Sequence, residues 1–218
     1  MVETVAIVDY GSGNLRSAEK AFARAAGEAG LSATVTVTSN PETVRGADRI
    51  VLPGVGAFGD CMAGLAAIDG MVDALTDSVT QHGAPFFGIC VGMHLMAEKG
   101  FEHGEHAGLG WLPGTVKPLK PSDKTLKIPH MGWNTIELTG AGCAHPVAAT
   151  LGADDHAYFV HSYQMQLNGS DALLGSADHG GPVTAIVGRD NMVGTQFHPE
   201  KSQAVGLKLI TAFLEWRP

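Results

Sequence analysis

The sequence predicts one α/β domain, residues 1–218, built on a mixed but mainly parallel central sheet with helices on both faces. Residues 4–10 and 49–52 are near-continuous apolar runs, typical of strands buried on both faces, and residues 35–38 form a further strand. Helical segments separate these runs, and a β-α-β-α-β order requires right-handed crossovers between parallel strands. A chain of 218 residues is long enough to bury a sizeable core.

The helices of the first half follow from apolar periodicity and from glycine. Residues 15–29 are alanine-rich with apolar side chains on one helical face, and Gly30 ends this helix as a C-terminal glycine often does. Residues 61–67 and 71–81 are amphipathic, and both are expected to be helical. A further helix is expected over residues 91–99.

The second half of the chain changes rhythm from residue 100 onward. Strand-length segments are separated by turn-rich stretches with few helical intervals, so we expect antiparallel strands that extend the sheet. A final helix is expected from Ser202 to Trp216. The expected strands lie around residues 111, 126–128, 133–138, 158–160, 165–167, 172–177, 183–187 and 193–197.

Composition and charge limit the class of function. The formal net charge is −8, whereas phosphate contacts need clustered Lys and Arg, so we expect no nucleic-acid partner. No run approaches the ~18 apolar residues that span a bilayer, so no membrane association is expected. Cys61, Cys90 and Cys143 are too far apart in sequence for a disulfide framework or a metal-binding pair, so we expect a reducing cytoplasm and no metal or other cofactor.

A cysteine between two glycines is the candidate nucleophile. Residues 85–89 read as a buried strand, and Gly88, Cys90 and Gly92 then form G-x-C-x-G, the thiol version of a nucleophile elbow. The glycines remove steric conflict in a tight strand-to-helix turn, and the positive end of the following helix favours a thiolate. Taken alone, the pattern also fits a small buried cysteine in an ordinary turn.

A base and its orienting group follow the last expected strand. A thiol nucleophile needs a base that takes its proton, and that base needs a carboxylate or amide to orient it. His198 lies at the end of a strand, Glu200 can hydrogen-bond its ring, and Pro199 restricts the backbone between them. An isolated pair of this kind is also common on surfaces, but its position at a strand end, like that of Cys90, favours catalysis.

N–H donors for an oxyanion are expected from two places, because acyl transfer needs them to stabilise a tetrahedral intermediate. The N–H of Val91 begins the elbow helix, and a loop rich in glycine and proline, residues 53–59, exposes its backbone after a strand. Both follow the carboxyl ends of strands, where open α/β sheets place their sites. The loop could instead be a plain turn or a phosphate cradle, but no Lys-Ser/Thr follows it, which excludes a P-loop.

These motifs resemble those of a known family. The Gly-Ile-Cys-Val-Gly-Met and Phe-His-Pro-Glu motifs resemble the class I, or triad, glutamine amidotransferases, which implies their three-layer fold. More narrowly, several segments resemble the glutaminase subunit of imidazole glycerol phosphate synthase, an enzyme of histidine biosynthesis. These segments are residues 9–15, 52–56, 129–134, 158–163 and 196–202, which cover almost the whole chain in consistent order.

The resemblance implies a role for each site residue. Cys90 would attack the side-chain amide of glutamine and release ammonia, with His198 as base and then acid and Glu200 orienting it; water would hydrolyse the resulting thioester to glutamate. The N–H groups of Val55 and Val91 correspond to the family's oxyanion donors. The residues that would hold the amino-acid end of the substrate are Gly56, Glu102, Ser162 and Tyr163, and His94 is a further substrate-binding candidate.

Position 94 departs from the family's pattern. The elbow is usually followed by a glutamine that contacts the substrate, and this chain has His94 there. An imidazole can also hydrogen-bond a carboxylate or an amide, so His94 is kept among the substrate-binding residues. The alternative is that His94 only fills the first helical turn.

The resemblance also implies a partner, a separate (βα)8-barrel cyclase that forms a heterodimer with this subunit. The cyclase would use the ammonia to make imidazole glycerol phosphate and an aminoimidazole carboxamide ribotide, and the family's glutaminase is nearly silent until the cyclase binds its nucleotide. Residues implied at the interface are Asn14, Trp133, Tyr158 and Lys201. The alternatives are a different triad glutaminase, such as the one that supplies pyridoxal phosphate synthase, a cysteine hydrolase acting on peptides, or a non-catalytic regulatory subunit on the same fold.

Overall fold

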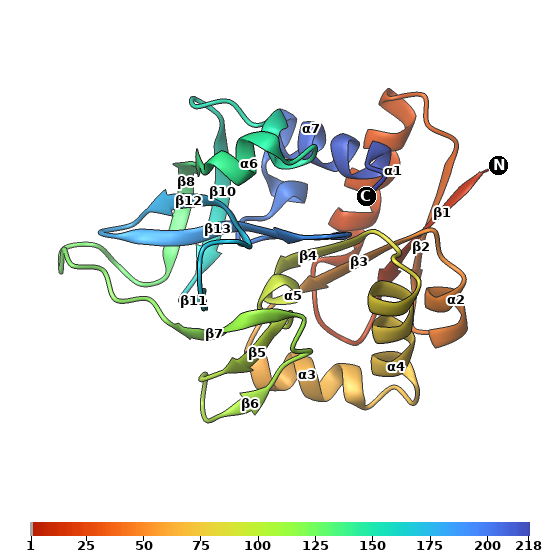
Figure 1. Ribbon diagram of the computed structural model, residues 1–218, viewed down its shortest axis with the longest axis horizontal. Coiled ribbons are helices and arrows are strands. Elements are labelled where there is room, and N and C mark those ends of the chain that lie inside the picture. Colours follow the sequence, from red (N-terminus) through yellow and green to blue (C-terminus); the bar gives the residue numbers. More distant parts are fainter. Residues whose placement is uncertain (1) are drawn as a thin grey trace.

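The computed structural model describes residues 2–218 and contains an eight-stranded central sheet between two layers of helices (Figure 1). The first five strands in the order β2-β1-β3-β4-β14-β13-β12-β9 are parallel and the remainder are antiparallel, which confirms the predicted mixed, mainly parallel sheet. Its strands are β1 (Glu3–Val8), β2 (Ala33–Thr38), β3 (Arg49–Gly54), β4 (Phe86–Cys90), β9 (Glu137–Leu138), β12 (Leu173–Asp178), β13 (Pro182–Arg189) and β14 (Met192–Thr195).

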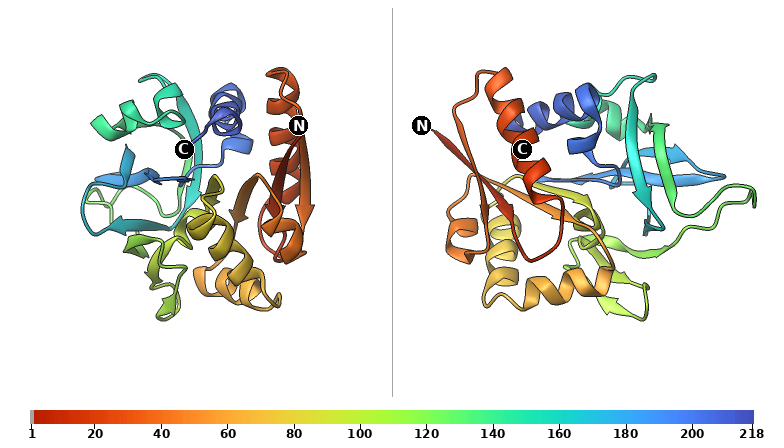
Figure 2. Two further views of the ribbon diagram at one scale, coloured as in Figure 1. Left: turned by 45° about the vertical axis from the view of Figure 1, so that its right-hand side comes forward. Right: turned by 180° about the vertical axis from the view of Figure 1, so that it is seen from behind.

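Helices lie on both faces of this sheet, as the sequence predicts (Figures 1 and 2). One face carries α1 (Leu15–Glu28), which packs against α7 (Gln203–Glu215), and the short α6 (Gly140–Ala144) lies on the same side. The other face carries α2 (Pro41–Arg45), α3 (Phe58–Ala66), α4 (Met71–Thr76) and the π-helical turn η1 (Asp77–Gln81). None of the helices within residues 2–218 has the length and apolarity needed to cross a membrane.

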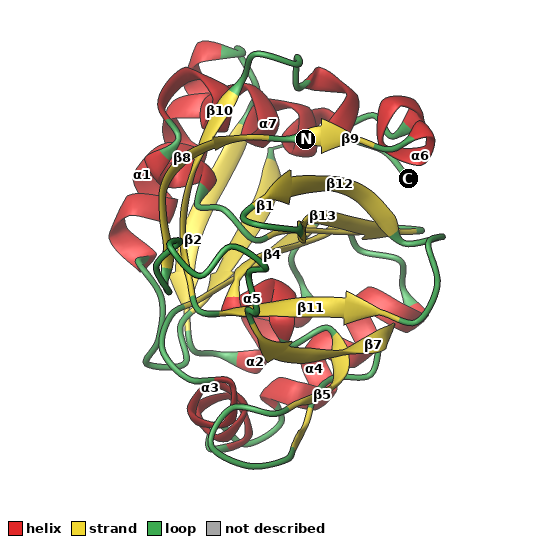
Figure 3. Ribbon diagram, turned by 90° about the vertical axis from the view of Figure 1, so that its left-hand side faces the viewer, coloured by secondary structure: helices red, strands yellow, loops and turns green. Residues whose placement is uncertain are grey.

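The expectation that all later strands extend one sheet is only partly correct. Strands β9 and β12 to β14 join the central sheet, but the others form two small sheets beside it (Figure 3). One small sheet has the order β11 (Tyr163–Leu167), β7 (Leu112–Pro118), β5 (Ala97–Gly100) and β6 (His106–Ala107). The other pairs β8 (His130–Thr135) with β10 (His156–His161), and two 3-10 turns, η2 (Ala148–Thr150) and η3 (Pro199–Lys201), complete the chain.

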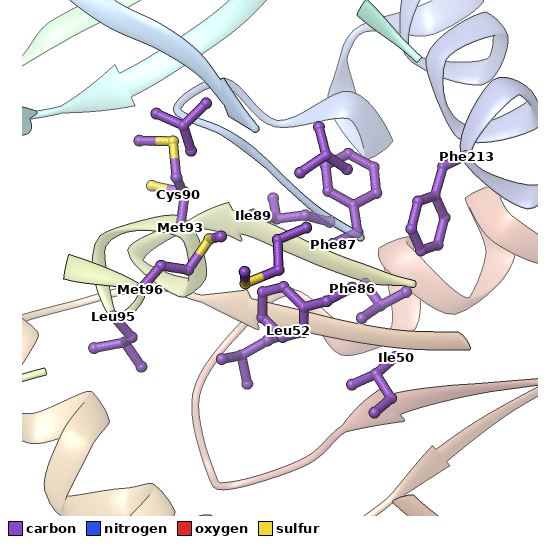
Figure 4. Packing of buried hydrophobic residues seen from close by; sticks show 14 of the residues in the cluster. Ile50, Leu52, Phe86, Phe87, Ile89, Cys90, Met93, Leu95, Met96 and Phe213 are labelled. Carbon is purple, nitrogen blue, oxygen red and sulfur yellow. The ribbon is translucent and has the colours of Figure 1, made fainter. Parts of the chain in front are cut away.

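The elbow helix is much shorter than expected. Helix α5 (Val91–His94) has one turn, after which the chain enters β5 instead of continuing as a helix to residue 99. The physical reason is that Leu95, Met96 and Ala97 are all fully buried, so this segment has no polar face to present to solvent. Figure 4 shows Leu95 and Met96 among the buried hydrophobic residues. A one-turn helix offers N–H groups at its start but only a small dipole.

The two strands beneath the elbow form a rigid floor for the site. Every residue of β3 and β4 is buried, as near-continuous apolar runs predict for strands covered on both faces. The ring of Phe87 lies 6.1 Å from that of Phe22 and 5.1 Å from that of Phe213, which ties β4 to α1 and α7. Full burial of such a side chain contributes roughly 1.5–3 kcal/mol, so the floor is among the most stable parts of the fold.

Candidate active site

Cys90 lies at a strained turn between β4 and α5. Its φ of 54° and ψ of −110° are unusual for a residue other than glycine, and such strain is typical of functional turns. A Cβ on Gly92 would lie 1.7 Å from the carbonyl oxygen of Leu52, and one on Gly88 would lie 2.8 Å from the carbonyl oxygen of Gly92. Gly92 therefore lets the elbow pack directly against β3, and Gly88 lets α5 approach β4, which is the relief of steric conflict that the sequence motif predicts.

Pairing between β3 and β4 brings the glycine-rich loop to the elbow, because Gly54 lies opposite Cys90 in the parallel register. Strand β3 includes Pro53 and Gly54, whereas the sequence suggests that a strand ends before them. Beyond this point the N–H of Val55 donates to Oγ of Ser12 at 3.1 Å, and the Ser12 hydroxyl donates to the Val55 carbonyl at 2.6 Å. In this conformation one of the two expected oxyanion donors is bound to Ser12.

His198 and Glu200 form a buried pair beside the elbow. Nδ1 of His198 donates to Oε1 of Glu200 at 2.9 Å, and the two side chains are only 3% and 2% exposed. The backbone of His198 is fixed on both sides, since its N–H donates to the Tyr158 carbonyl at 3.0 Å and its carbonyl accepts from the Ser202 hydroxyl at 2.7 Å. Because Nδ1 is occupied by the carboxylate, Nε2 is left for the nucleophile.

The electrostatics of this pair suit a thiolate. Burial acts against a charge on His198, but hydrogen bonds to Cys90 and Glu200 and the attraction of these two groups outweigh it and raise the pKa of His198 to about 9. The imidazole is therefore protonated at neutral pH, with a carboxylate on one nitrogen and a sulfur near the other. An imidazolium in this position favours the thiolate form of a neighbouring cysteine.

Cys90 and His198 line a cavity of about 510 Å³. The same cavity is lined by all seven residues implied for the oxyanion hole and for substrate, namely Val55, Gly56, Val91, His94, Glu102, Ser162 and Tyr163. A larger cavity of about 710 Å³ lies beside α6 and is lined by none of these residues. The reactive side chains of the smaller cavity, and not its volume, therefore identify it as the candidate site. Within residues 2–218, no group of three or more His, Cys, Asp or Glu side chains is arranged to hold a metal ion.

Two of the implied substrate residues also form hydrogen bonds within the protein. Oε2 of Glu102 accepts the N–H of Phe58 at 2.9 Å and so caps α3, whose preceding residue Ala57 has no side chain that can cap. Nε2 of His94 donates to Oε1 of Gln196 at 2.7 Å, and the His94 side chain is buried. Both residues therefore have structural partners in addition to facing the cavity.

Ser12, Gln196 and His161 belong to the site but were not singled out from the sequence. Gln196 precedes His198 by two residues, so alternation along the strand expected over residues 193–197 could have placed both side chains on one face, although β14 ends at Thr195. No comparable local signal identifies Ser12 or His161, because their partners are distant in sequence. His161 adjoins the implied substrate residue Ser162 and lines the cavity.

Two neighbouring histidines are locked in single tautomers. Nδ1 of His161 donates to the Tyr163 carbonyl at 2.9 Å, so its Nε2 must accept a hydrogen bond from Nδ1 of His130, also at 2.9 Å. Burial, together with the repulsion of nearby histidines, lowers the pKa of His130 to about 4 and that of His161 to about 3. Both imidazoles are therefore neutral at neutral pH.

The buried histidines predict a loss of stability in acid. Burial lowers the pKa of His94 and His130 to about 4 and that of His161 to about 3, from 6.5 in the unfolded chain. A base with a depressed pKa stabilises the fold above its unfolded pKa, and this stability is lost as the pH falls below 6.5 towards the folded pKa. We expect each of these histidines to lower the free energy of unfolding by about 1–2 kcal/mol as the pH falls from 7.5 to 5, as measured by urea denaturation. A His130→Asn variant should lose less stability over this range, whereas the exposed control His82→Gln should match the unaltered chain; an unchanged urea midpoint would contradict the prediction.

Three of the four implied interface residues lie together. Trp133 and Tyr158 are directly opposite in the β8–β10 pair, with ring centres 5.8 Å apart, and Nζ of Lys201 lies 5.7 Å from the Tyr158 ring. Asn14 lies apart from them in sequence and precedes α1, where its carbonyl accepts the N–H of Ala18. The cluster of Trp133, Tyr158 and Lys201 adjoins the site, because Lys201 also lines the cavity.

Comparisons with known proteins identify the family of this chain. Residues 6–215 match the family model described as glutamine amidotransferase class-I. The chain is 58% identical over 217 residues to the imidazole glycerol phosphate synthase subunit HisH of Mesorhizobium japonicum, covering 98% of this chain and 99% of that protein. Identity to the HisH subunit of Rhodospirillum rubrum is 54% over 214 residues, with 98% and 99% coverage.

Solved structures of low sequence identity share the fold. One crystal structure of a glutamine amidotransferase has a TM-score of 0.70 at 21% identity and 97% coverage of both chains. Another, a glutamine amidotransferase from Thermotoga maritima, has a TM-score of 0.69 at 14% identity, with 99% coverage of this chain and 97% of that chain. The chain therefore belongs to the class-I glutamine amidotransferase family and, within it, to the HisH subunits of imidazole glycerol phosphate synthase.

Proposed function

We propose that this chain hydrolyses glutamine to glutamate and ammonia and supplies the ammonia to a separate (βα)8-barrel cyclase in histidine biosynthesis. The observation that carries the proposal is that Cys90 and His198 line one cavity and that Glu200 hydrogen-bonds His198, in a chain 58% identical to a HisH subunit. The three free cysteines, Cys61, Cys90 and Cys143, fit work in a reducing cytoplasm.

The proposed reaction runs in two steps on the sulfur of Cys90. The thiolate attacks the carbonyl carbon of the glutamine side-chain amide, and the negative oxygen is held by the N–H groups of Val91 and Val55. His198 then donates its Nε2 proton to the leaving nitrogen, and ammonia departs from a glutamyl thioester. Water attacks the thioester while His198 takes its proton, which releases glutamate and restores the thiolate.

The walls of the cavity suit the amino-acid end of glutamine. The carboxylate of Glu102 is a partner for the α-ammonium group, and Gly56, Ser162 and Tyr163 supply backbone and side-chain groups for the α-carboxylate. Gly56 has a φ of 92°, a conformation that glycine adopts without strain, so it can present its backbone to a ligand.

An electrophilic glutamine analogue tests whether the cavity takes glutamine. A diazo ketone that carries its reactive carbon in place of the side-chain amide should alkylate Cys90 and leave Cys61 and Cys143 unmodified, as measured by peptide mass spectrometry. Excess glutamine should protect Cys90, and excess asparagine, one methylene shorter, should protect it far less. Labelling of all three cysteines, or labelling unaffected by glutamine, would contradict the proposal.

The resting site lacks one oxyanion donor, because the N–H of Val55 is bound to Ser12. The Val55 carbonyl also accepts from the Ser12 hydroxyl at 2.6 Å and from Sγ of Cys61 at 3.3 Å, so the peptide groups on both sides of Val55 are held. The proposed cycle needs the Val55 N–H to turn towards the substrate oxygen. This geometry predicts that glutamine hydrolysis is slow in the resting conformation and becomes fast when the loop rearranges.

Removing the Ser12 hydroxyl should raise the basal rate of glutamine hydrolysis. Ser12→Ala deletes two hydrogen bonds that hold the resting loop, each worth about 1 kcal/mol, so the active orientation becomes roughly thirtyfold more populated. Steady-state release of glutamate by the isolated chain measures the effect. Ser32→Ala, at an exposed position outside the site, should leave the rate unchanged, and a basal rate that falls in Ser12→Ala would show that Ser12 does not restrain the loop.

Exposed apolar side chains next to the cavity mark the expected docking surface for the cyclase. Ile128 is 48% exposed, Met131 is 62% exposed and Trp133 is 48% exposed, which is unusual for large apolar residues. Trp133 belongs to the cluster with Tyr158 and Lys201, and Lys201 lines the cavity. A partner docked there would cover the site and receive ammonia before water protonates it.

A further inference from the structure

An unusual chain of hydrogen bonds leads from the elbow helix back to the nucleophile. Nε2 of His94 donates to Oε1 of Gln196 at 2.7 Å, and Nε2 of Gln196 donates to Sγ of Cys90 at 3.8 Å. His94 is 3% exposed, and Gln196 is fully buried. We propose that Gln196 is a catalytic residue whose amide N–H stabilises the Cys90 thiolate, and that His94 is the positioning residue that fixes which end of this amide faces the sulfur.

The amide oxygen of Gln196 sets the direction of the first hydrogen bond. Burial lowers the pKa of His94 to about 4, so its imidazole is neutral at neutral pH and carries a single N–H. An amide oxygen can only accept a hydrogen bond, so the proton must be on Nε2 when that nitrogen faces Oε1 of Gln196. Nδ1 is then the nitrogen without a proton.

The direction of the first bond fixes the second. A glutamine amide can rotate by a half turn and exchange its oxygen and its NH2 group. With the oxygen held by His94, the NH2 group faces Cys90 and acts as a donor to the sulfur. In the opposite orientation the amide oxygen would face a thiolate, which is electrostatically unfavourable.

This arrangement uses the position at which the chain departs from the family pattern. His94 stands where the resemblance predicts a glutamine, and the structure links it to Gln196 in addition to the cavity. A donated hydrogen bond to an ionised group is stronger than one between neutral groups, so Gln196 favours the reactive form of the nucleophile. The inference rests on the proposed function only in taking Cys90 as the nucleophile.

Site-resolved alkylation of the isolated chain tests both roles without requiring glutamine hydrolysis. Iodoacetamide reacts with thiolates, and mass spectrometry separates Cys90 from the exposed Cys143, which serves as an internal control. In Gln196→Leu and in His94→Leu, the pH profile of Cys90 alkylation should move up by about one unit, with about tenfold slower alkylation at pH 7. The Cys143 profile should not move.

Matched variants separate positioning from simple packing. His94→Gln keeps an N–H donor towards Gln196 and should retain the unaltered Cys90 profile, whereas His94→Leu keeps the bulk and loses the donor. His82→Gln, at an exposed histidine outside the site, controls for the loss of a histidine. Circular dichroism and thermal unfolding establish that each variant is folded.

A second measurement uses the unaltered chain and does not depend on any variant folding. Nitrogen-15 chemical shifts of His94 at pH 7 should show a protonated Nε2 and an unprotonated Nδ1. The opposite tautomer, or Cys90 profiles that stay in place in both folded leucine variants, would overturn the inference. A shifted profile in a chain that never hydrolyses glutamine would leave the inference standing and count against the proposed function.

Discussion

Replacing Cys90 with alanine abolishes glutamine hydrolysis and leaves the fold intact. The sulfur is the only group at the elbow that can form the thioester. Loss of the nucleophile from a catalytic triad costs at least ~10⁴-fold in kcat. The free energy of unfolding of the variant should lie within about 1 kcal/mol of that of the unaltered chain, because alanine keeps the backbone conformation and removes one atom from a 4% exposed side chain.

A matched variant separates the effect of losing the nucleophile from the effect of losing any other thiol. Cys143 is free and exposed, so Cys143→Ala should hydrolyse glutamine at the unaltered rate. Glutamate release measured at saturating glutamine gives kcat for each chain. Residual hydrolysis in Cys90→Ala above one part in about a thousand would require a different nucleophile.

Replacing Gly92 with alanine should destroy the site and destabilise the whole fold. The added Cβ would lie 1.7 Å from the Leu52 carbonyl oxygen, a backbone atom within β3, so either the elbow or the strand must move. Overpacking against backbone in a buried sheet is expected to cost more than about 3 kcal/mol. Urea denaturation and glutamine hydrolysis should both reveal the loss.

Gly27 provides the control for this substitution. It lies within helix α1, and a Cβ placed there meets nothing within 4 Å. Gly27 is in the last turn of α1, so Gly27→Ala should stabilise the chain by no more than about 0.5–1 kcal/mol, the gain from this change in a helix interior. Equal stability losses in the two variants would show that the contact with Leu52 is not what requires glycine at the elbow.

The parallel sheet and the elbow could be predicted from the sequence because their signals are local. Continuous apolar runs identified β3 and β4, and the glycines beside Cys90 identified the strained turn between strand and helix. The confirmed mixed sheet follows from the same pattern. These features depend on residues close together in the chain.

The remaining features depend on contacts between distant segments. The length of α5 could not be predicted, since the burial of Leu95 to Ala97 from all sides is a tertiary effect that ends the helix after one turn. The division of the later strands into three sheets depends on pairing partners that periodicity does not specify. Ser12 and Val55 are 43 residues apart, so the occupied oxyanion donor is visible only in the structure.

Glutamine hydrolysis measured with and without a cyclase subunit and its nucleotide substrate tests the central claim most directly. The chain should form a heterodimer with an imidazole glycerol phosphate synthase cyclase, and the nucleotide should raise glutamate release by at least about tenfold as the second oxyanion donor becomes available. This stimulation should disappear in Cys90→Ala, with the heterodimer still formed. Hydrolysis that proceeds at one rate whether or not the cyclase and its nucleotide are present would contradict the claim.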